Sequence, residues 1–251
     1  MLRRIRDHEG WTVDAQDGNN VGTIRDFYFD DQRWTVRYLV IDAGNWFTGR
    51  RIVISLMAID AIDWEEGRVR LRLTRERIKD APPAPFERPL TRGYESTFST
   101  YYGYPTYWAG PGLWGPVATP AMIPPPGASA AMPEARPTQR DEQHVRNVRE
   151  VSGYHIATSD GEIGHVEDFL FDEETWEIRY LIVDTSNWIG GRSVLLSTDW
   201  VTVVDWPRRL VQVDVTRDAV RHSPRYDPGA VIDRAYEERL ADVYRRRVRA
   251  I

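Results

Sequence analysis

Short apolar runs separated by turn residues recur along the chain, a pattern that is typical of β-strands. In the first third of the sequence no run keeps a 3.6-residue apolar period for more than about one turn. Turn pairs such as Asp17-Gly18 and Glu66-Gly67 separate the runs, because Asp and Gly tolerate tight backbone geometry. We therefore expect six strands, at residues 11–15, 21–29, 34–42, 51–54, 59–64 and 68–73.

Two of these strands differ in the burial that their sequences predict. In the last strand Val69, Leu71 and Leu73 alternate with arginines, so one face is expected in the core and the other in water. The strand at 34–42 instead contains the continuous apolar run Tyr-Leu-Val-Ile at 38–41. Such a strand needs cover on both faces, from the core and from a helix or a partner.

The second half of the chain repeats the first. Residues 22–82 align with residues 164–224 at an offset of 142, with 21 identities in 61 positions. The register continues to Glu95 and Glu237 and to Tyr102 and Tyr244. Self-similarity at a fixed period indicates two copies of one fold.

A helix is expected after each repeated core. At the C-terminus, over residues 225–251, Asp227-Pro228 forms a helix-start pair, and the apolar residues that follow share one helical stripe. The corresponding segment, 83–103, has aromatic residues at similar spacing but weaker helix formers. The C-terminal stripe consists of Ile232, Tyr236, Leu240, Val243, Tyr244 and Val248.

Between the repeats the composition changes sharply. Residues 82–137 contain 13 of the 16 prolines, which predicts an extended or disordered Pro/Gly-rich linker over 104–140. The aromatic residues at 94–114 leave two alternatives open, packing against a barrel or exposure to a partner. The expected domain order is thus a first barrel (1–82), a helical segment (83–103), the linker (104–140), a second barrel (141–224) and a terminal helix (225–251).

Both copies carry one set of strand and loop motifs. These are G-x-[IV]-x-D-[FY]-x-[FL]-D, W-x-[IV]-R-Y-[LI]-[VI]-[VI]-D, and a loop with N-W and G-R. The pattern resembles the PRC-barrel family, named after the cytoplasmic domain of the photosynthetic reaction centre H subunit and including the C-terminal domain of a ribosome maturation factor. In copy one the matching residues are Gly22, Asp26, Phe27, Phe29, Asp30, Trp34, Arg37, Tyr38, Asp42, Asn45, Trp46 and Arg50, and copy two has the same residue types 142 positions later.

The resemblance implies a fold class and a kind of function. It implies a mainly β protein with two tandem small barrels of about six strands each, each followed by an α-helix and joined by the Pro-rich linker. It also implies a binding or assembly module without chemistry of its own. Fold alone does not fix function, so the partner has to be argued separately.

Composition narrows the class of protein. With 41% hydrophobic and 28% charged residues, the chain is expected to be soluble and to bury a core. No apolar run approaches the ~20 residues of a membrane-spanning helix, and the N-terminus lacks the apolar segment of a secretory signal. We therefore expect a bacterial cytoplasmic protein, free or peripheral at the inner face of the cytoplasmic membrane. A net charge of −5 argues against a chain-wide nucleic-acid surface.

No catalytic or cofactor motif stands out. The absence of cysteine excludes thiolate chemistry, and the five histidines lack metal-ligand spacing. The repeated acids and arginines, such as Asp26 and Arg37, are interpreted as turn residues and cross-strand ion pairs. We expect no enzyme activity, no metal and no cofactor.

The tryptophans suggest where a partner would bind. Trp34 and Trp64 are expected in the barrel core, whereas the N-W loop is expected to be partly exposed. The C-terminal arginines at 245–249 are attributed to the helix dipole, although RNA or anionic membranes are alternatives. The predicted interaction surface consists of Trp46, Arg50, Trp188, Arg192, Tyr236, Leu240 and Tyr244.

These observations favour a scaffold or adaptor that docks another protein, with a membrane-bound or electron-transfer complex of the reaction-centre kind as the expected assembly. The alternative is an accessory protein of RNA processing or ribosome assembly. Nucleic acid is therefore the less favoured partner. The exposed apolar strands and helices also predict an intramolecular pseudo-dimer of the two barrels, and a homo-oligomer remains open.

Overall fold

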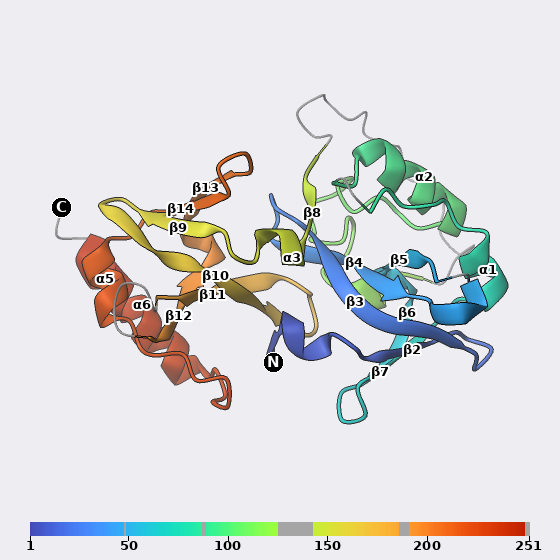
Figure 1. Cartoon of the computed structure of the whole chain (residues 1–251), viewed down its shortest axis with the longest axis horizontal. Coiled ribbons are helices and arrows are strands. Elements are labelled where there is room, and N and C mark those ends of the chain that lie inside the picture. Colours follow the sequence, from blue (N-terminus) through green and yellow to red (C-terminus); the bar gives the residue numbers. More distant parts are fainter. Residues whose placement is uncertain (48, 87–88, 125–142, 186–190, 249–251) are drawn as a thin grey trace. The chain divides into compact units, whose positions relative to one another are not determined.

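The computed structural model divides the chain into two compact units. It describes residues 1–47, 49–86, 89–124, 143–185 and 191–248, and of 245–248 only the backbone. The N-unit comprises Asp7–Arg149 and Glu174–Glu177. The C-unit comprises Met1–Arg6, Glu150–Glu173 and Ile178–Ile251. Each unit contains a seven-stranded sheet (Figure 1).

The N-unit sheet follows the order β5-β4-β3-β2-β7-β6, and β8 also pairs with β3. The β2–β7 pairing is parallel, and the other pairings are antiparallel. Its strands are β2 (Thr12–Asp14), β3 (Asn20–Asp30), β4 (Thr35–Asp42), β5 (Arg51–Ser55), β6 (Ile59–Asp63), β7 (Arg68–Leu71) and β8 (Val145–Asn147).

The C-unit sheet has the equivalent order, β12-β11-β10-β9-β14-β13, with β1 pairing on β10. The same single pairing, here β14 with β9, is parallel. The strands are β1 (Leu2–Arg4), β9 (His155–Thr158), β10 (Gly161–Asp172), β11 (Ile178–Asp184), β12 (Ser193–Ser197), β13 (Val201–Asp205) and β14 (Leu210–Val213). The predicted mainly β fold with two tandem domains is therefore confirmed.

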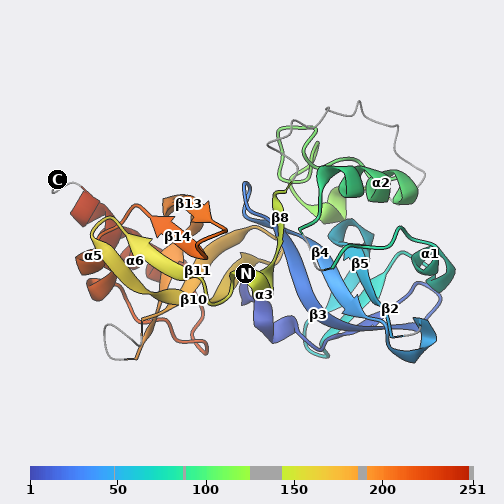
Figure 2. The ribbon, with the colours of Figure 1, turned by 45° about the horizontal axis from the view of Figure 1, so that its top comes forward.

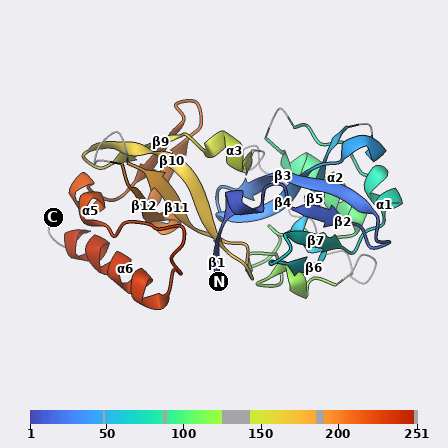
Figure 3. The ribbon, with the colours of Figure 1, turned by 60° about the horizontal axis from the view of Figure 1, so that its bottom comes forward.

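The seventh strand of each sheet comes from the other repeat. β1 precedes repeat one along the chain but pairs with β10 of the C-unit, Leu2 lying opposite Asp172 (Figure 3). β8 precedes repeat two but pairs with β3 of the N-unit, Val145 lying opposite Asp30. β1 and β8 are thus exchanged between the two predicted barrel regions, 1–82 and 141–224. A three-residue strand is too short to leave a periodic signal in the sequence.

The expected helix after each core is present. α2 runs along the N-unit sheet (Figure 2) and α6 along the C-unit sheet (Figure 3). Thr91 caps α2 by accepting a hydrogen bond from the Tyr94 backbone, and Gly103 ends it in the left-handed conformation. The helices are α1 (Arg75–Lys79), α2 (Arg92–Tyr102), α3 (Val148–Val151), α5 (Arg217–His222) and α6 (Arg234–Val248), with 3-10 turns η1 (Ile5–His8), η2 (Gly44–Phe47), η3 (Leu56–Ala58), η4 (Pro120–Met122) and η6 (Thr198–Trp200).

Strand β4, whose sequence is apolar on both faces, is covered by a helix. All of β4 except its last residue is buried. On one face Tyr38 meets Phe98 of α2 edge to face, with ring centroids 5.5 Å apart. An aromatic helix face thus covers β4, the strand with apolar side chains on both faces.

Residues 104–124 fold into the N-unit, so the prediction of an extended or disordered linker is wrong for them. The Trp114 side chain is fully buried, and its indole Nε1 donates to the carbonyl of Thr175 at 2.8 Å. Tyr104 and Tyr107 are also buried. Residues 125–140 lie outside the described residues. The aromatic segment 94–114 therefore packs against its own sheet.

Candidate functional site

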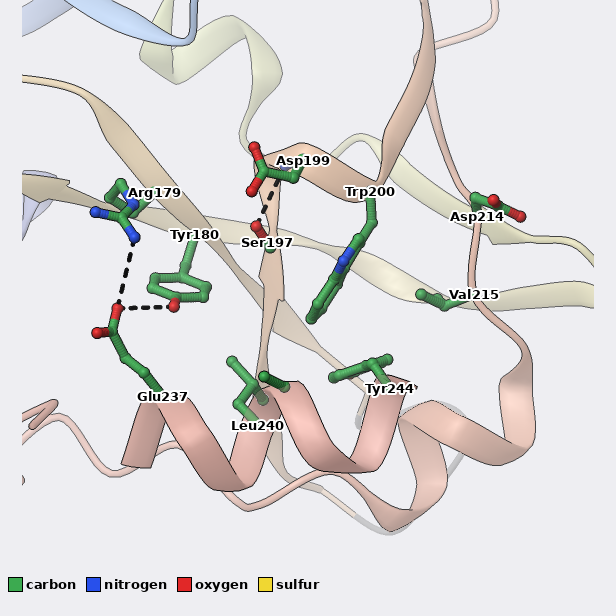
Figure 4. A pocket seen from close by; sticks show the side chains of 11 residues that line it. Arg179, Tyr180, Ser197, Asp199, Trp200, Asp214, Val215, Glu237, Leu240 and Tyr244 are labelled. Atoms are coloured by element: carbon green, nitrogen blue, oxygen red, sulfur yellow. Dashed lines mark hydrogen bonds and ion pairs between the residues drawn. The ribbon is translucent and has the colours of Figure 1, made fainter. Parts of the chain in front are cut away.

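A pocket of about 630 Å³ lies in the C-unit, where α6 faces the sheet (Figure 4). Strands β11 and β12, turn η6, the residues after β14 and helix α6 all contribute to it. The lining consists of Arg179, Tyr180, Ser197, Asp199, Trp200, Asp214, Val215, Glu237, Leu240, Ala241 and Tyr244.

One end of the pocket is polar. Glu237 of α6 points toward the sheet (Figure 4), where it accepts a hydrogen bond from the Tyr180 hydroxyl at 2.9 Å. Its carboxylate also pairs with the Arg179 guanidinium at 3.8 Å. Burial, followed by the Glu237 carboxylate, raises the pKa of Tyr180, so this phenol stays a hydrogen-bond donor at neutral pH.

The other end of the pocket is aromatic. The Trp200 ring, in η6, lies 4.2 Å from the ring of Tyr244 on α6, centroid to centroid. Leu240, one turn earlier on α6, projects toward the same space (Figure 4). Tyr244 and Leu240 are buried, whereas Trp200 is half-buried. This end thus offers apolar surface to a ligand.

Acidic side chains dominate the charge of the lining. Asp199 and Asp214 are exposed, and with Glu237 they place three carboxylates around the pocket against the single guanidinium of Arg179. An excess of negative charge at a concave surface favours cationic groups in a ligand.

The equivalent pocket in the N-unit is filled by a segment of the chain itself. With the offset of 142 residues, the residues Arg37, Tyr38 and Glu95 correspond to Arg179, Tyr180 and Glu237. The space remaining there is only about 10 Å³. The segment 104–114 fills it, contributing Tyr104, Tyr107 and Trp114 to its walls.

Tyr107 makes the central contacts in the filled pocket. Its hydroxyl donates to Glu95 at 2.8 Å and accepts from Arg92 Nη1 at 2.6 Å. Its ring lies on the Arg37 guanidinium, 3.7 Å from Cζ to the ring centroid, and Arg37 Nη1 donates to the Leu113 carbonyl at 2.5 Å. Arg37 is fully buried, whereas the equivalent Arg179 side chain is 46% exposed.

Burial shifts the pKa values of the charged groups in the filled pocket. Desolvation raises the pKa of Glu95, although Arg92 and the tyrosine hydroxyls oppose this. Desolvation lowers the pKa of Arg37, which Tyr107 and Asp30 oppose. The charged groups of this region are thus held by one another, with Arg37 3.5 Å from the Asp30 carboxylate.

Comparison with known protein families identifies both repeats. The sequence model described as the PRC-barrel domain matches residues 2–78 and, a second time, residues 144–220. Together the matches cover more than half of the chain. The chain belongs to the PRC-barrel family. A search of curated proteins finds no match.

In the first PRC-barrel domain, Trp46 and Arg50 lie away from the equivalent of the α6 pocket. Trp46 is half-buried, as predicted, and its Nε1 donates to the Val21 carbonyl at 2.7 Å beneath the Arg75 guanidinium. Arg50 is exposed and lines a different pocket, of about 430 Å³, with Phe47 and others. The structure therefore does not bring these two residues into one site with α6.

In the second PRC-barrel domain the predicted residues divide into three groups. Trp188 lies outside the described residues. Arg192 is half-buried and donates to the Val220 carbonyl at 3.1 Å, which is a structural contact. Tyr236, Leu240 and Tyr244 are buried within the C-unit, so they are largely interior and only Leu240 and Tyr244 reach the pocket.

The sequence interpretation missed most of the pocket. The sequence marks Arg179 and Tyr180 only as members of the repeated motif, and it marks Glu237 only as part of the C-terminal helix. The available signal was a difference between otherwise similar PRC-barrel copies: Met57, Ala58 and Arg72 of copy one become Asp199, Trp200 and Asp214 in copy two.

The remaining predicted features are structural. Trp34 and Trp64 are half-buried instead of core residues, and Trp34 sits in a turn with a φ of 46°. Within the described ranges, no group of three or more His, Asp or Glu side chains is placed to hold a metal ion. No described helix has the length and apolar character needed to span a membrane.

Proposed function

We propose that this protein is a non-catalytic docking module, and that the C-unit pocket beside α6 receives a segment of another protein. The observation that carries the proposal is the contrast between the two PRC-barrel domains. The same place holds about 630 Å³ of open space in the C-unit and about 10 Å³ in the N-unit, where a polypeptide segment fills it.

The lining supports polypeptide binding over catalysis. Aromatic and aliphatic side chains form one end and hydrogen-bonding groups the other, which is the composition of protein-binding surfaces. Glu237 and Tyr180 are already bonded to each other. In the N-unit the equivalent groups serve to hold a folded segment.

The resemblance of both repeats to the cytoplasmic domain of the reaction-centre H subunit supports a further part of the proposal. We place the partner in a membrane-bound or electron-transfer assembly reached from the cytoplasm.

Affinity capture with matched helix variants tests the docking function. Ala241→Phe fills the pocket from α6, whereas Ala235→Phe places the same side chain at an exposed position of the same helix. We expect a partner that binds the wild type and Ala235→Phe, is lost with Ala241→Phe, and repeats this behaviour when purified. Identical capture by all three proteins, or recovery of nuclease-sensitive RNA alone, would contradict the proposal.

A further inference from the structure

The hydrogen bond at the polar end of the pocket is the same in both PRC-barrel domains. The Tyr38 hydroxyl donates to Glu95 at 2.8 Å, and the Tyr180 hydroxyl donates to Glu237 at 2.9 Å. In the N-unit a second hydroxyl, from Tyr107, also donates to the glutamate. In the C-unit the corresponding space is part of the open pocket. The Glu237 carboxylate is thus suited to accept a second hydrogen bond, from a tyrosine hydroxyl of a bound polypeptide.

The retained arginine suits the ring of the same tyrosine. Arg37 lies against the Tyr107 ring at 3.7 Å and donates to a backbone carbonyl of the segment. Arg179 occupies the equivalent position with nearly half of its side chain exposed. A guanidinium that stacks on an aromatic ring and binds a carbonyl fixes a polypeptide in one orientation.

The other half of the pocket differs between the domains. In the N-unit Tyr104 stacks on Tyr102, with centroids 5.7 Å apart and planes at 18°. In the C-unit the ring of Trp200, which replaces Ala58, contacts the ring of the equivalent Tyr244 at a tilt of 39°, with centroids 4.2 Å apart. The Tyr244 ring thus already has an aromatic partner within the C-unit, so an incoming segment does not need a second tyrosine to cover it.

Charge indicates which side chain would suit the incoming segment in place of that tyrosine. Arg72, which influences the pKa of Tyr104 by its charge, is replaced in the C-unit by Asp214, and Met57 is replaced by Asp199. Both carboxylates line the open pocket. A lysine or arginine three residues before the docking tyrosine, as Tyr104 precedes Tyr107, would bring a cationic group to this acidic lining.

A second copy of this chain is a poor occupant. Its own segment 104–114 contains no lysine or arginine. That segment is also held in the N-unit, where Tyr107 and Trp114 are buried, and releasing it would expose both rings to water. The occupant is thus a different polypeptide.

We propose that the C-unit pocket binds a loop of a partner protein that carries a tyrosine with a basic residue three positions earlier. The tyrosine hydroxyl donates to Glu237, its ring stacks on Arg179, and the basic side chain pairs with Asp199 and Asp214. This inference rests on the docking function proposed above.

Synthetic peptides derived from the chain test the inference. The parent peptide covers residues 103–115, the second carries Tyr104→Lys, and the third carries Tyr104→Lys with Tyr107→Phe. Each is titrated into the full-length, isotope-labelled protein at low and high salt, with the Trp200 indole and the α6 amides as NMR probes. We expect the Tyr104→Lys peptide to bind at least about fivefold more tightly than the parent, and to weaken severalfold at high salt because the added pairing is ionic.

The hydroxyl contact is tested on both partners. Removing the hydroxyl with Tyr107→Phe is expected to weaken the Lys-containing peptide about tenfold, since the hydrogen bond is made to a charged group. Glu237→Gln in the protein should weaken the same peptide similarly. The matched control is Glu238→Gln, because Glu238 is exposed and pairs with Arg234; it should leave binding unchanged.

The outcomes separate this inference from the docking function. No binding of the Tyr104→Lys peptide up to millimolar concentration, or equal weakening by Glu237→Gln and Glu238→Gln, overturns the inference. If a partner is nevertheless lost with Ala241→Phe and kept with Ala235→Phe, the docking function stands with a ligand of other chemistry. If the peptide binds but no partner depends on the pocket, the docking function fails while the pocket chemistry holds.

Discussion

The Tyr107 hydroxyl shows how one atom stabilises the filled pocket of the N-unit. It lies between the Glu95 carboxylate and the Arg92 guanidinium, and both of these side chains are buried. A buried polar group that loses a partner cannot regain it from water. The segment 104–114 is therefore held by hydrogen bonds as well as by its rings.

Tyr107→Phe is accordingly expected to lower the free energy of unfolding by about 1–3 kcal/mol. The matched control is Tyr101→Phe, because the Tyr101 hydroxyl donates to the Arg77 carbonyl at the surface. That change should stay within about 0.5 kcal/mol. Urea unfolding followed by circular dichroism measures both, and equal stability of the two variants would contradict the role of the Tyr107 hydroxyl.

Asp26 predicts a pH dependence of stability. Burial is the main cause that raises its pKa from 3.8 to about 6, against the Phe27 amide, Asn147 and Arg149, which lower it. A raised folded-state pKa favours the protonated fold, so this contribution is fully present below pH 3.8 and is lost as the pH rises through about 6.

Asp26→Asn keeps a neutral side chain at every pH. Its stability relative to the wild type should therefore increase between about pH 4 and pH 7. Urea unfolding at intervals across this range gives the difference, and a carboxyl NMR titration of the wild type reports the Asp26 pKa directly. A difference that does not change with pH would show that the carboxyl titrates alike in the folded and unfolded chain.

The sequence alone predicts the surroundings of a single side chain where one physical rule decides them. Arg37 of β4 pairs with the Asp30 carboxylate of β3, a cross-strand ion pair of the kind expected for the repeated acids and arginines. Trp46 is partly exposed because it lies in the short surface turn η2 after β4. Arg179 was not recognised as a pocket residue, because its exposure depends on the absence of a covering segment, which no local pattern encodes.

At the level of elements, the exchanged strands are tied in by specific side chains. Arg4 of β1 pairs with the buried Asp168 carboxylate of β10 at 2.8 Å and with Glu167 at 2.7 Å. In the N-unit, Asn147 of β8 bonds to Asp26, the residue equivalent to Asp168. Each repeat thus supplies the partner for a buried acid of the other.

Arg4→Ala should therefore destabilise the C-unit although residue 4 begins repeat one. Loss of the arginine leaves the Asp168 carboxylate buried without its ion pair, at a cost of about 3 kcal/mol. Hydrogen exchange should accelerate in β10 and β11 and stay slow in β3 and β4. Asn147→Ala is the reciprocal variant and should loosen β3 and β4. Faster exchange in β3 and β4 for Arg4→Ala would contradict the strand assignment.

The elements also show how far the sequence pattern could predict the fold. The six strands of each core follow from alternation and turn residues, and α6 follows from its apolar stripe. The pairing of β1 and β8 was not predictable, since a three-residue strand leaves no periodic signal in the sequence. The sequence does not predict the folding of 104–124, because its high proline content indicates a linker. The opposing signal is the presence of four large aromatic residues, Tyr104, Tyr107, Trp108 and Trp114.

At the level of the whole molecule, the exchange means that a repeat and a folded unit are different pieces of chain. A fragment of residues 1–142 contains β1 without its partner β10, and it leaves open the side of β3 that β8 covers. An unpaired strand edge promotes association with another chain. A fragment of residues 7–149 instead contains β3 together with β8 and lacks β1.

The two fragments are expected to differ in oligomeric state. In fragment 1–142, β1 of one copy can take the place of β8 on β3 of another, and reciprocal exchange closes a dimer. Fragment 7–149 has that place filled from within and should remain monomeric. Light scattering coupled to size-exclusion chromatography, over a range of concentrations, measures this directly. A monomeric fragment 1–142 as stable as fragment 7–149 would show that β1 can pair within its own repeat, and the exchange would then not be imposed by the sequence.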